Sequence, residues 1–234
     1  LLVLKERRGG PHVVPVDIAI PEGCMALVIS GANTGGKTVA LKTLGLLTLM
    51  ALSSIPVTAD EGSVAIVFTG IFSDIGDRQD IIASLSTFSA HVKRLKGFLG
   101  EAGPGSLVLV DEIGAGTDPS EGGALALAAL ETLRAQGAKT IVTTHLNLLK
   151  AHAQADRAYL NASVEFDEKT LKPLYRLHYG VPGPSLGLSI AESLGIPHDV
   201  IELARKNIRE KEGAFINSIL LLEGEKEEIR SLKE

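Results

Sequence analysis

The chain contains the stretch Gly31-Ala32-Asn33-Thr34-Gly35-Gly36-Lys37-Thr38, which follows the pattern G-x-x-x-x-G-K-[S/T] of phosphate-binding loops. The apolar run Cys24–Ser30 before it has the length and β-branched content of a buried strand, and the Ala- and Leu-rich run Val39–Leu52 after it predicts a helix. Glycines let backbone N–H groups converge on an anion, and a helix N-terminus adds about half a positive charge there. We therefore expect these eight residues to bind a nucleotide, with Lys37 on the outer phosphates and the Thr38 hydroxyl on Mg²⁺.

A second apolar run, Leu107–Val110, is followed directly by the two acids Asp111 and Glu112. The carboxyl ends of parallel strands meet at one edge of a sheet, so we expect this strand tip beside the glycine loop. Asp111 is then predicted to hold Mg²⁺, directly or through water, and Glu112 to orient and deprotonate an attacking water. Adjacent carboxylates at the end of a buried strand reduce stability unless a metal or a donor compensates them, which favours this functional interpretation.

Two further polar stretches are candidates for the same site. Thr143-Thr144-His145 ends the predicted strand Lys139–Thr144, and a histidine at a strand tip beside Glu112 can sense a γ-phosphate; the alternative is an ordinary polar histidine. The stretch Ala83–Ser89 precedes a predicted helix and, taken alone, is only an N-cap cluster. At a subunit interface, however, the same helix N-terminus would close on a neighbour's γ-phosphate. The glycine-containing turn Ile113–Pro119 is interpreted as backbone that approaches another chain closely.

The remaining pattern predicts an α/β fold, with a mostly parallel sheet wrapped by helices. Extended segments are expected at His12–Ile20, Val64–Phe68 and Ile71–Phe72, and a polar loop at Ser73–Asp80. The expected helices are Phe88–Phe98, capped by Ser86 or Thr87, and one that begins at Pro119 with Ala126, Leu127, Leu130 and Leu133 inward. After these we expect an antiparallel hairpin of Tyr159–Phe166 with Leu171–Leu177, the two helices Pro184–Leu194 and Pro197–Ile208, and an outgoing charged helix over Gly213–Glu234.

Composition limits the classes of function. The 234 residues are 45% hydrophobic, which allows one large core, and the net charge of −5 shows no basic excess of the kind that binds nucleic acid. The single cysteine, Cys24, excludes an internal disulfide and fits a reducing compartment; we expect it to be a buried apolar residue. Leu41–Leu52 is too short and too polar to span a bilayer, so no membrane is expected. Because the chain begins at Leu1, we expect a fragment of a longer protein.

Several phrases, taken in order, resemble the ATPase domain of the MutS family over nearly the whole chain. They are G-A-N-T-G-G-K-T, S-L-S-T-F-S, L-V-L-V-D-E-I-G-A-G-T-D-P, T-T-H and L-H-Y-G-V-P-G-P-S-L-G-L-S-I-A-E-S-L-G-I-P. The resemblance is closest to the second bacterial paralogue, MutS-two, in Asn33, the Gly35-Gly36 pair, the S-T-F string and Asn161–Asp167. It implies an ABC-type P-loop NTPase with an antiparallel β subdomain: a core over residues 1–180, a dimerising helix–turn–helix over 181–212 and an outgoing segment over 213–234.

The resemblance also implies roles for residues and partners. Asp111 and Glu112 match the family's Mg²⁺-linked aspartate and catalytic glutamate, His145 matches its switch histidine, and Ser86 matches the signature serine that reaches the partner subunit's γ-phosphate. ATP, ADP and Mg²⁺ are the implied cofactors, in two composite sites of a homodimer. The whole proteins are associated with suppressing recombination, with branched DNA and with stalled ribosomes in the bacterial cytoplasm, and carry a C-terminal nuclease domain beyond these residues. Ala32 replaces a usual proline, and Val13 stands where mismatch-repair relatives have an aromatic residue.

Two alternatives stay open. One is the ABC-type head of a transporter or of a chromosome-structural protein, although a transporter normally shows L-S-G-G-Q where this chain has L-S-T-F-S. The other is a nucleotide-gated clamp, in which ATP joins two subunits and hydrolysis is incidental. Turnover by the isolated domain distinguishes an enzyme from a switch, and we expect it to be slow because Ser86 acts only across an interface.

Overall fold

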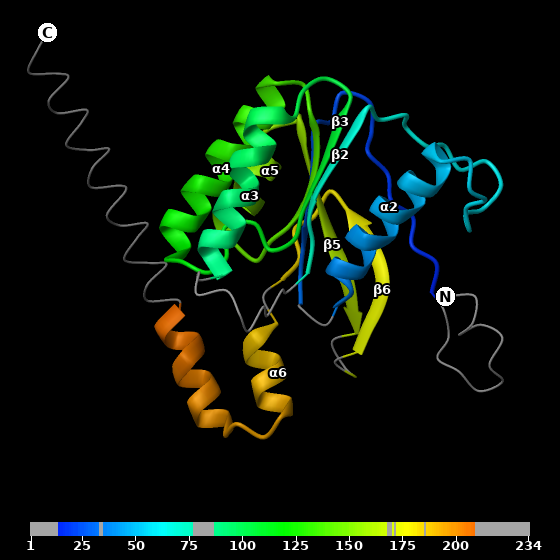
Figure 1. The fold of residues 1–234 in the computed structure, drawn as a ribbon. Helices are drawn as coiled ribbons and strands as arrows, with labels where there is room; N and C mark the ends of the chain where they lie inside the picture. Colours follow the sequence, from blue (N-terminus) through cyan, green and yellow to red (C-terminus); the bar gives the residue numbers. More distant parts are fainter. Residues whose placement is uncertain are drawn as a thin grey trace, which may run out of the picture. The chain divides into compact units, whose positions relative to one another are not determined.

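The computed structural model describes residues 14–32, 35–76, 87–167, 170, 172–184 and 186–208. The chain divides into two compact units, Leu1–Ser185 and Leu186–Glu234, and each is described by itself. The first unit is built on a six-stranded sheet in the order β2-β3-β4-β1-β5-β6 (Figure 1). Its strands are β1 (Ala26–Ser30), β2 (Gly70–Asp74), β3 (Ser106–Val110), β4 (Lys139–Thr143), β5 (Tyr159–Asp167) and β6 (Lys172–Tyr179).

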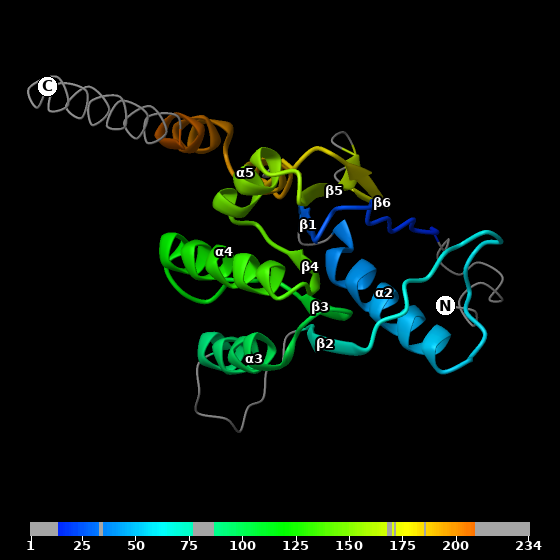
Figure 2. The same cartoon turned by 90° about the horizontal axis from the view of Figure 1, so that it is seen from above.

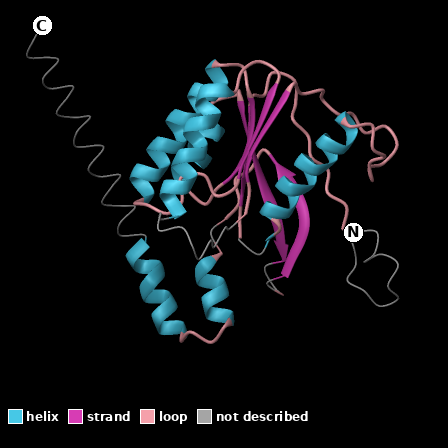
Figure 3. Ribbon diagram, in the orientation of Figure 1, coloured by secondary structure: helices cyan, strands magenta, loops and turns pink. Residues whose placement is uncertain are grey.

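Helices cover both faces of this sheet. They are α2 (Lys37–Leu52), α3 (Thr87–Glu101), α4 (Pro119–Ala135) and α5 (Asn147–Ala155). Seen from above, α2 lies on one side of the strands and α3, α4 and α5 lie on the other (Figure 2). Among the strands of the described residues, β2, β3, β4, β1 and β5 pair in parallel, and β6 runs antiparallel to β5. The predicted α/β class with a mostly parallel sheet is therefore confirmed. Figure 3 distinguishes the helices from the strands by colour.

The central strands explain why the sheet needs two helical layers. Every residue of β1 and of β3 is buried, as expected for parallel strands covered on both faces. Alternate residues enter two separate cores: Val28 and Val108 join the core under α4, whereas Leu27 and Leu107 join the core that includes Leu41 of α2. Because side chains alternate along a strand, one apolar run serves both layers. This arrangement holds the carboxyl ends of the strands rigidly at one edge.

Several expected elements differ from the structure. Residues 14–20 form no strand; the Tyr179 hydroxyl holds them instead, accepting from Ala19 N at 2.9 Å and donating to Asp17 O at 2.8 Å. Residues 63–68 form no strand either, because the segment lies uncovered, with Val64 93% exposed. The strand around Ile71 continues to Asp74, which was expected in a loop.

Two helices on the same face of the sheet also depart from expectation. Leu127 of α4 is only half-buried, and Ala129 is buried in the core instead. Helix α5 was not predicted, although the spacing of the buried Leu149 and Ala153 is a helical signal. The run is only nine residues long and has no side-chain N-cap, so the usual start signal is missing.

The second unit contains the two predicted helices, α6 (Gly187–Ser193) and a helix over residues 198–208. Glu192 joins them: its carboxylate accepts from His198 Nδ1 at 2.7 Å and from Arg205 Nη2 at 3.2 Å. The hydrogen bond from His198 lowers the pKa of Glu192, and the Glu192 carboxylate raises the pKa of His198. The pair therefore stabilises the turn most where both groups are charged.

Some predictions fall on residues outside the described part of the chain: Val13, Asn33, Thr34, Ser86 and the segment Gly213–Glu234. The proposed boundary near residue 180 stays a prediction. Among the helices that the structure describes, none combines the length and the apolar character needed to cross a membrane.

Candidate functional site

The glycine loop, residues 31–38, joins the end of β1 to the first turn of α2. Gly31 and Gly36 have φ angles of 121° and 91°, in the region that favours glycine, and Gly36 is the N-cap of α2. A Cβ on Gly31 or on Gly35 would lie 2.6 or 2.4 Å from Val164 Cγ2 of β5. The loop therefore needs glycine both for its backbone angles and for its close packing on the neighbouring strand.

Lys37 lies inside this loop. It is only 3% exposed, and its Nζ donates to the carbonyls of Gly31 at 2.7 Å and Ala32 at 3.0 Å. Burial lowers the pKa of Lys37; the negative charges of Glu112 and Asp111 oppose this shift, and the positive charge of Lys150 adds to it. The loop therefore encloses a cation, in the position where the sequence predicts the contact with outer phosphates.

The two predicted Mg²⁺ ligands lie side by side. Thr38 Oγ1, from the first turn of α2, donates to Asp111 Oδ2 at 2.8 Å, although 73 residues separate them in the sequence. The other oxygen, Oδ1, accepts from Thr143 Oγ1 of β4 at 2.6 Å, and Asp111 is buried. Carboxylate and hydroxyl oxygens are ligands that suit Mg²⁺, so this pair has the right chemistry for that ion. Within the described residues no ion pair reaches Asp111.

Glu112 follows in an unusual backbone conformation. Its φ of 50° is left-handed, which costs a non-glycine residue on the order of 1–3 kcal/mol, and its N–H donates to Thr143 Oγ1 at 2.8 Å. Thr143 thus holds both acids at once. Strain of this kind concentrates at functional sites, where the surroundings impose a side-chain direction. The half-buried Glu112 lines a cleft with Asp74 and His91, between β3, α3 and α4.

The backbone of the turn after Glu112 lies very close to the backbone of α4. A Cβ on Gly122 of α4 would lie 2.1 Å from the carbonyl oxygen of Gly114, and one on Gly114 would lie 2.4 Å from that of Gly122. The close approach that the structure shows is to α4; the expected approach of this turn to another chain stays a prediction. Asp118 then caps α4, accepting from Ser120 N at 2.9 Å and Glu121 N at 3.2 Å.

His145 lies exposed directly after the carboxyl end of β4. Its position is fixed through the buried Thr144, whose N–H donates to Ile29 O of β1 at 3.0 Å. In the described part of the chain, no hydrogen bond joins the His145 ring to Glu112. The structure therefore brings Lys37, Thr38, Asp111 and Glu112 to one edge, and leaves His145 exposed at that edge.

Sequence reasoning missed three groups at this edge. Asp74, at the end of β2, is buried and pairs with His91 Nδ1 at 2.6 Å and Arg94 Nε at 2.9 Å. The available signal was weak, because Ser73 separates Asp74 from the apolar pair Ile71 and Phe72, whereas Asp111 follows an apolar run directly. Lys150 of α5 and Tyr175 of β6 carry no comparable signal, because only the tertiary fold brings them to the loop. Tyr175, with φ of 57°, has its ring against Gly36.

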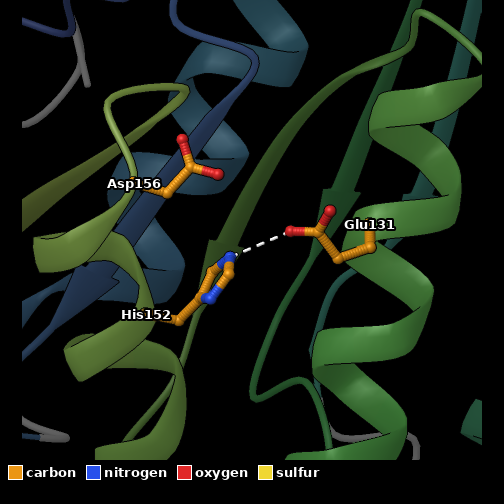
Figure 4. A group of neighbouring side chains, drawn as sticks. All are labelled: Glu131, His152 and Asp156. Carbon is orange, nitrogen blue, oxygen red and sulfur yellow. Dashed lines mark hydrogen bonds and ion pairs between the residues drawn. The ribbon is translucent and has the colours of Figure 1, made fainter.

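A second polar cluster lies at the opposite edge of the sheet, where Glu131 meets Tyr159, the first residue of β5; Figure 4 shows its members Glu131, His152 and Asp156. Glu131, His152 and Asp156 place ligand atoms within 4.8 Å of one another, as a metal site would. Their oxygens already have partners: Glu131 Oε1 lies 2.9 Å from His152 Nε2 and accepts from Tyr159 OH at 2.7 Å, and Asp156 Oδ2 lies 2.5 Å from Arg134 Nη1. This internal neutralisation favours a structural role.

Comparisons with known proteins agree with the motifs. Residues 27–212 match the family model of MutS domain V. The chain is 47% identical over 232 residues to Endonuclease MutS2 of Halothermothrix orenii, which covers 97% of this chain and 29% of that protein. It is 52% identical over 197 residues to Endonuclease MutS2 of Clostridium botulinum, covering 84% and 25%, and 54% identical over 194 residues to that of Pelotomaculum thermopropionicum, covering 83% and 25%.

The chain thus spans between 25% and 29% of the length of these relatives. The match to the family model and the alignment with the relatives both include the sheet, the glycine loop and the C-terminal helices. The chain therefore belongs to the MutS family, as a domain V of the MutS2 type.

Proposed function

We propose that this chain is the ATP-binding and ATP-hydrolysing domain of a MutS2-type protein, with the ABC-type P-loop NTPase fold. The observation that carries the proposal is the contact between Thr38 Oγ1 and Asp111 Oδ2, beside the buried ammonium of Lys37. A strand far from the glycine loop in the sequence, β3, thereby places the carboxylate of Asp111 beside that loop. A flexible glycine-rich turn has no need of that arrangement.

The residues fit ATP and Mg²⁺. The first turn of α2 has no side-chain cap, which leaves its N–H groups for phosphate oxygens, and Lys37 adds a positive charge. Thr38 and Asp111 would hold Mg²⁺, which supplies neutralisation of the charge on the β- and γ-phosphates. The backbone amides of Gly31, Gly35 and Gly36 would complete the cradle, together with Ala32, Asn33 and Thr34.

Glu112 is the proposed general base. It would accept a proton from the water that attacks the γ-phosphorus, while the bond to the bridging oxygen breaks and ADP leaves. Thr143 supports this role, because its hydroxyl fixes both the Glu112 backbone and the Asp111 carboxylate. We assign His145 as the γ-phosphate sensor, and Ser86 as the residue that completes the neighbouring subunit's site.

The partners are also proposals. We propose a homodimer, formed through two composite ATP sites and the helix–turn–helix within residues 181–212. The relatives' name, endonuclease, supports a DNA-processing role for the parent protein, with nuclease activity and contacts to branched DNA or ribosomes in regions beyond these residues. A bacterial cytoplasmic location fits that role. The family match favours this proposal over a transporter or chromosome-structural head, while a clamp with incidental hydrolysis differs only in turnover.

The decisive experiment compares the wild-type chain with Glu112→Gln, using MgATP hydrolysis, calorimetric binding of a non-hydrolysable ATP analogue, and solution mass. The amide keeps the shape but cannot accept the proton, so turnover should fall on the order of a thousandfold while binding is retained and an ATP-bound dimer accumulates. Glu121→Gln, on the exposed first turn of α4, is the matched control and should hydrolyse normally. Unchanged turnover in Glu112→Gln would remove Glu112 as the base.

A further inference from the structure

Lys150 is a buried cation that the proposed reaction does not use. It lies on α5, is 8% exposed, and its Nζ donates to Gly183 O at 3.3 Å. No ion pair reaches it within the described residues, and burial lowers the pKa of Lys150. Burying an ammonium against a single carbonyl at that distance reduces stability, so a contribution to folding does not explain the residue.

The acceptor, Gly183, is wedged against the start of the glycine loop. Its N–H donates to Ser30 Oγ at 2.8 Å, and a Cβ on Gly183 would lie 2.7 Å from both Cα and N of Gly31. Farther back in the same segment, Gly180 N donates to Asn161 O at 2.8 Å, and Asn161 Nδ2 donates to the Lys150 carbonyl at 3.0 Å. Residues 180–184 are therefore held between α5, β5 and Gly31.

Gly31 is also a contact of Lys37, which donates to its carbonyl. A polyphosphate on the loop competes for the donors of Lys37, so its binding changes the surroundings of the Gly31 peptide. Because Gly183 packs on Gly31, a change in the surroundings of the Gly31 peptide also changes the packing of Gly183. Lys37 and Lys150 are both buried ammonium groups, one bonded to Gly31 and the other to Gly183, which packs on Gly31, so a polyanion on the loop attracts both. Nucleotide and Lys150 are thus connected by backbone contact and by charge.

We infer that Lys150 is a positioning residue that holds residues 180–184 against Gly31, and so couples nucleotide occupancy of the glycine loop to the conformation of this segment. The inference rests on the proposed ATP binding. The segment leads along the chain into the C-terminal unit, which begins at Leu186. Because such coupling is reciprocal, a change that releases the segment also weakens nucleotide binding.

The test measures amide hydrogen exchange of residues 180–184 and calorimetric affinity, each with and without the magnesium complex of a non-hydrolysable ATP analogue. In the wild type, exchange at the hydrogen-bonded amides of Gly180 and Gly183 should change on binding. In Lys150→Met, this difference should be lost and affinity should fall at least about fivefold. Lys150→Arg keeps the charge and should restore part of both. A merely structural role would shift exchange equally in both conditions.

Lys139→Met is the matched control. Lys139 Nζ also donates to a backbone carbonyl, that of Cys24 at 2.8 Å, but Lys139 begins β4 at the opposite edge of the sheet. This variant should keep the nucleotide-dependent exchange difference and the wild-type affinity. An equal loss in both lysine variants would mean that burial of a lysine, rather than the position of Lys150, produces the effect.

A second pair tests the contact from the other side. Gly183→Ala should reproduce the Lys150→Met result with the lysine intact, because the new methyl group cannot fit against the Gly31 backbone. Gly187→Ala, whose Cβ would meet nothing within 4 Å, should not. Failure of the wild type to bind the analogue would contradict the proposed function. Normal binding with an unresponsive 180–184 segment, or an unchanged difference in Lys150→Met and Gly183→Ala, would overturn this inference alone.

Discussion

Two polar clusters lie at opposite edges of one sheet, and they manage charge differently. We call them the carboxyl-edge cluster (Lys37, Thr38, Asp111, Glu112 and Thr143) and the amino-edge cluster (Glu131, Arg134, His152, Asp156 and Tyr159). At the amino edge, hydrogen bonds from Tyr159 and His152 lower the pKa of Glu131, and those from Ala158 N and Arg134 lower the pKa of Asp156. At the carboxyl edge, Asp111 instead accepts from two hydroxyls.

The difference separates a structural cluster from a binding site. The amino-edge cluster neutralises itself, because each carboxylate meets a donor of the same cluster. At the carboxyl edge, Lys37 donates to the uncharged carbonyls of Gly31 and Ala32, and Asp111 accepts from two uncharged hydroxyls, a chemistry that suits a polyanion and its cation. Two of the three non-glycine residues with positive φ in the described ranges, Glu112 and Tyr175, lie beside the glycine loop; the third, Ser54, follows α2.

The largest expected effect is on nucleotide affinity. Lys37→Met should weaken binding of the ATP analogue on the order of 100-fold, because it removes a buried cation from the phosphates. Arg134→Met, at the amino edge, should change affinity by no more than about twofold, since distant sites act independently. Calorimetric titration of both variants is the measurement. Comparable losses in the two would erase the distinction between the clusters.

An intermediate effect is expected where the turn after Glu112 meets α4. Gly122→Ala places a methyl group 2.1 Å from the Gly114 carbonyl oxygen and should reduce the free energy of unfolding by about 1–3 kcal/mol. ATP turnover should fall as well, because the turn carries Glu112. The neighbouring Gly123→Ala meets only Leu148, at 3.4 Å, and should be neutral or more stable by up to about 1 kcal/mol. Urea unfolding of both variants checks the pair, and equal stabilities would contradict the close approach.

The smallest effect is expected at the amino edge, in the pH dependence of stability. The folded pKa of Glu131 is lowered from its ordinary value of 4.5, so its charge stabilises the fold above that pH, and the contribution is lost as pH falls through the folded pKa. Because Glu131 is 39% exposed, solvent screening limits the loss in Glu131→Gln at neutral pH to no more than about 1 kcal/mol.

Unfolding curves measured across the acid range check this prediction. The wild type and Glu131→Gln should converge in stability as pH falls through the lowered folded pKa of Glu131, and their affinities for the ATP analogue should agree throughout. Glu121→Gln, whose side chain is exposed, provides the control for removing any acid from α4. A difference between wild type and Glu131→Gln that persists unchanged into acid would show that the carboxylate charge is not what stabilises this edge.

Local patterns predicted well the elements that carry the site. The strand before the glycine loop, the helix after it and the strand that ends in Asp111 were all recognisable, because each is set by a run of neighbouring residues. The sequence pattern predicted the wrong element, or none, where no other element covers the segment or where the helix start signal is weak. Val64–Phe68 has an apolar pattern without a covering layer and is not a strand, and α5 begins without a cap.

By itself, then, the sequence determined the α/β class, the glycine loop, the acid pair and the family. The tertiary structure alone decided that β5 packs beside β1 and places Val164 against the glycine loop, that Gly183 packs on Gly31, and that Lys150 donates to Gly183. The physical reason is that periodicity encodes which residues are buried, whereas their partners depend on strand order and on contacts between residues far apart in the chain.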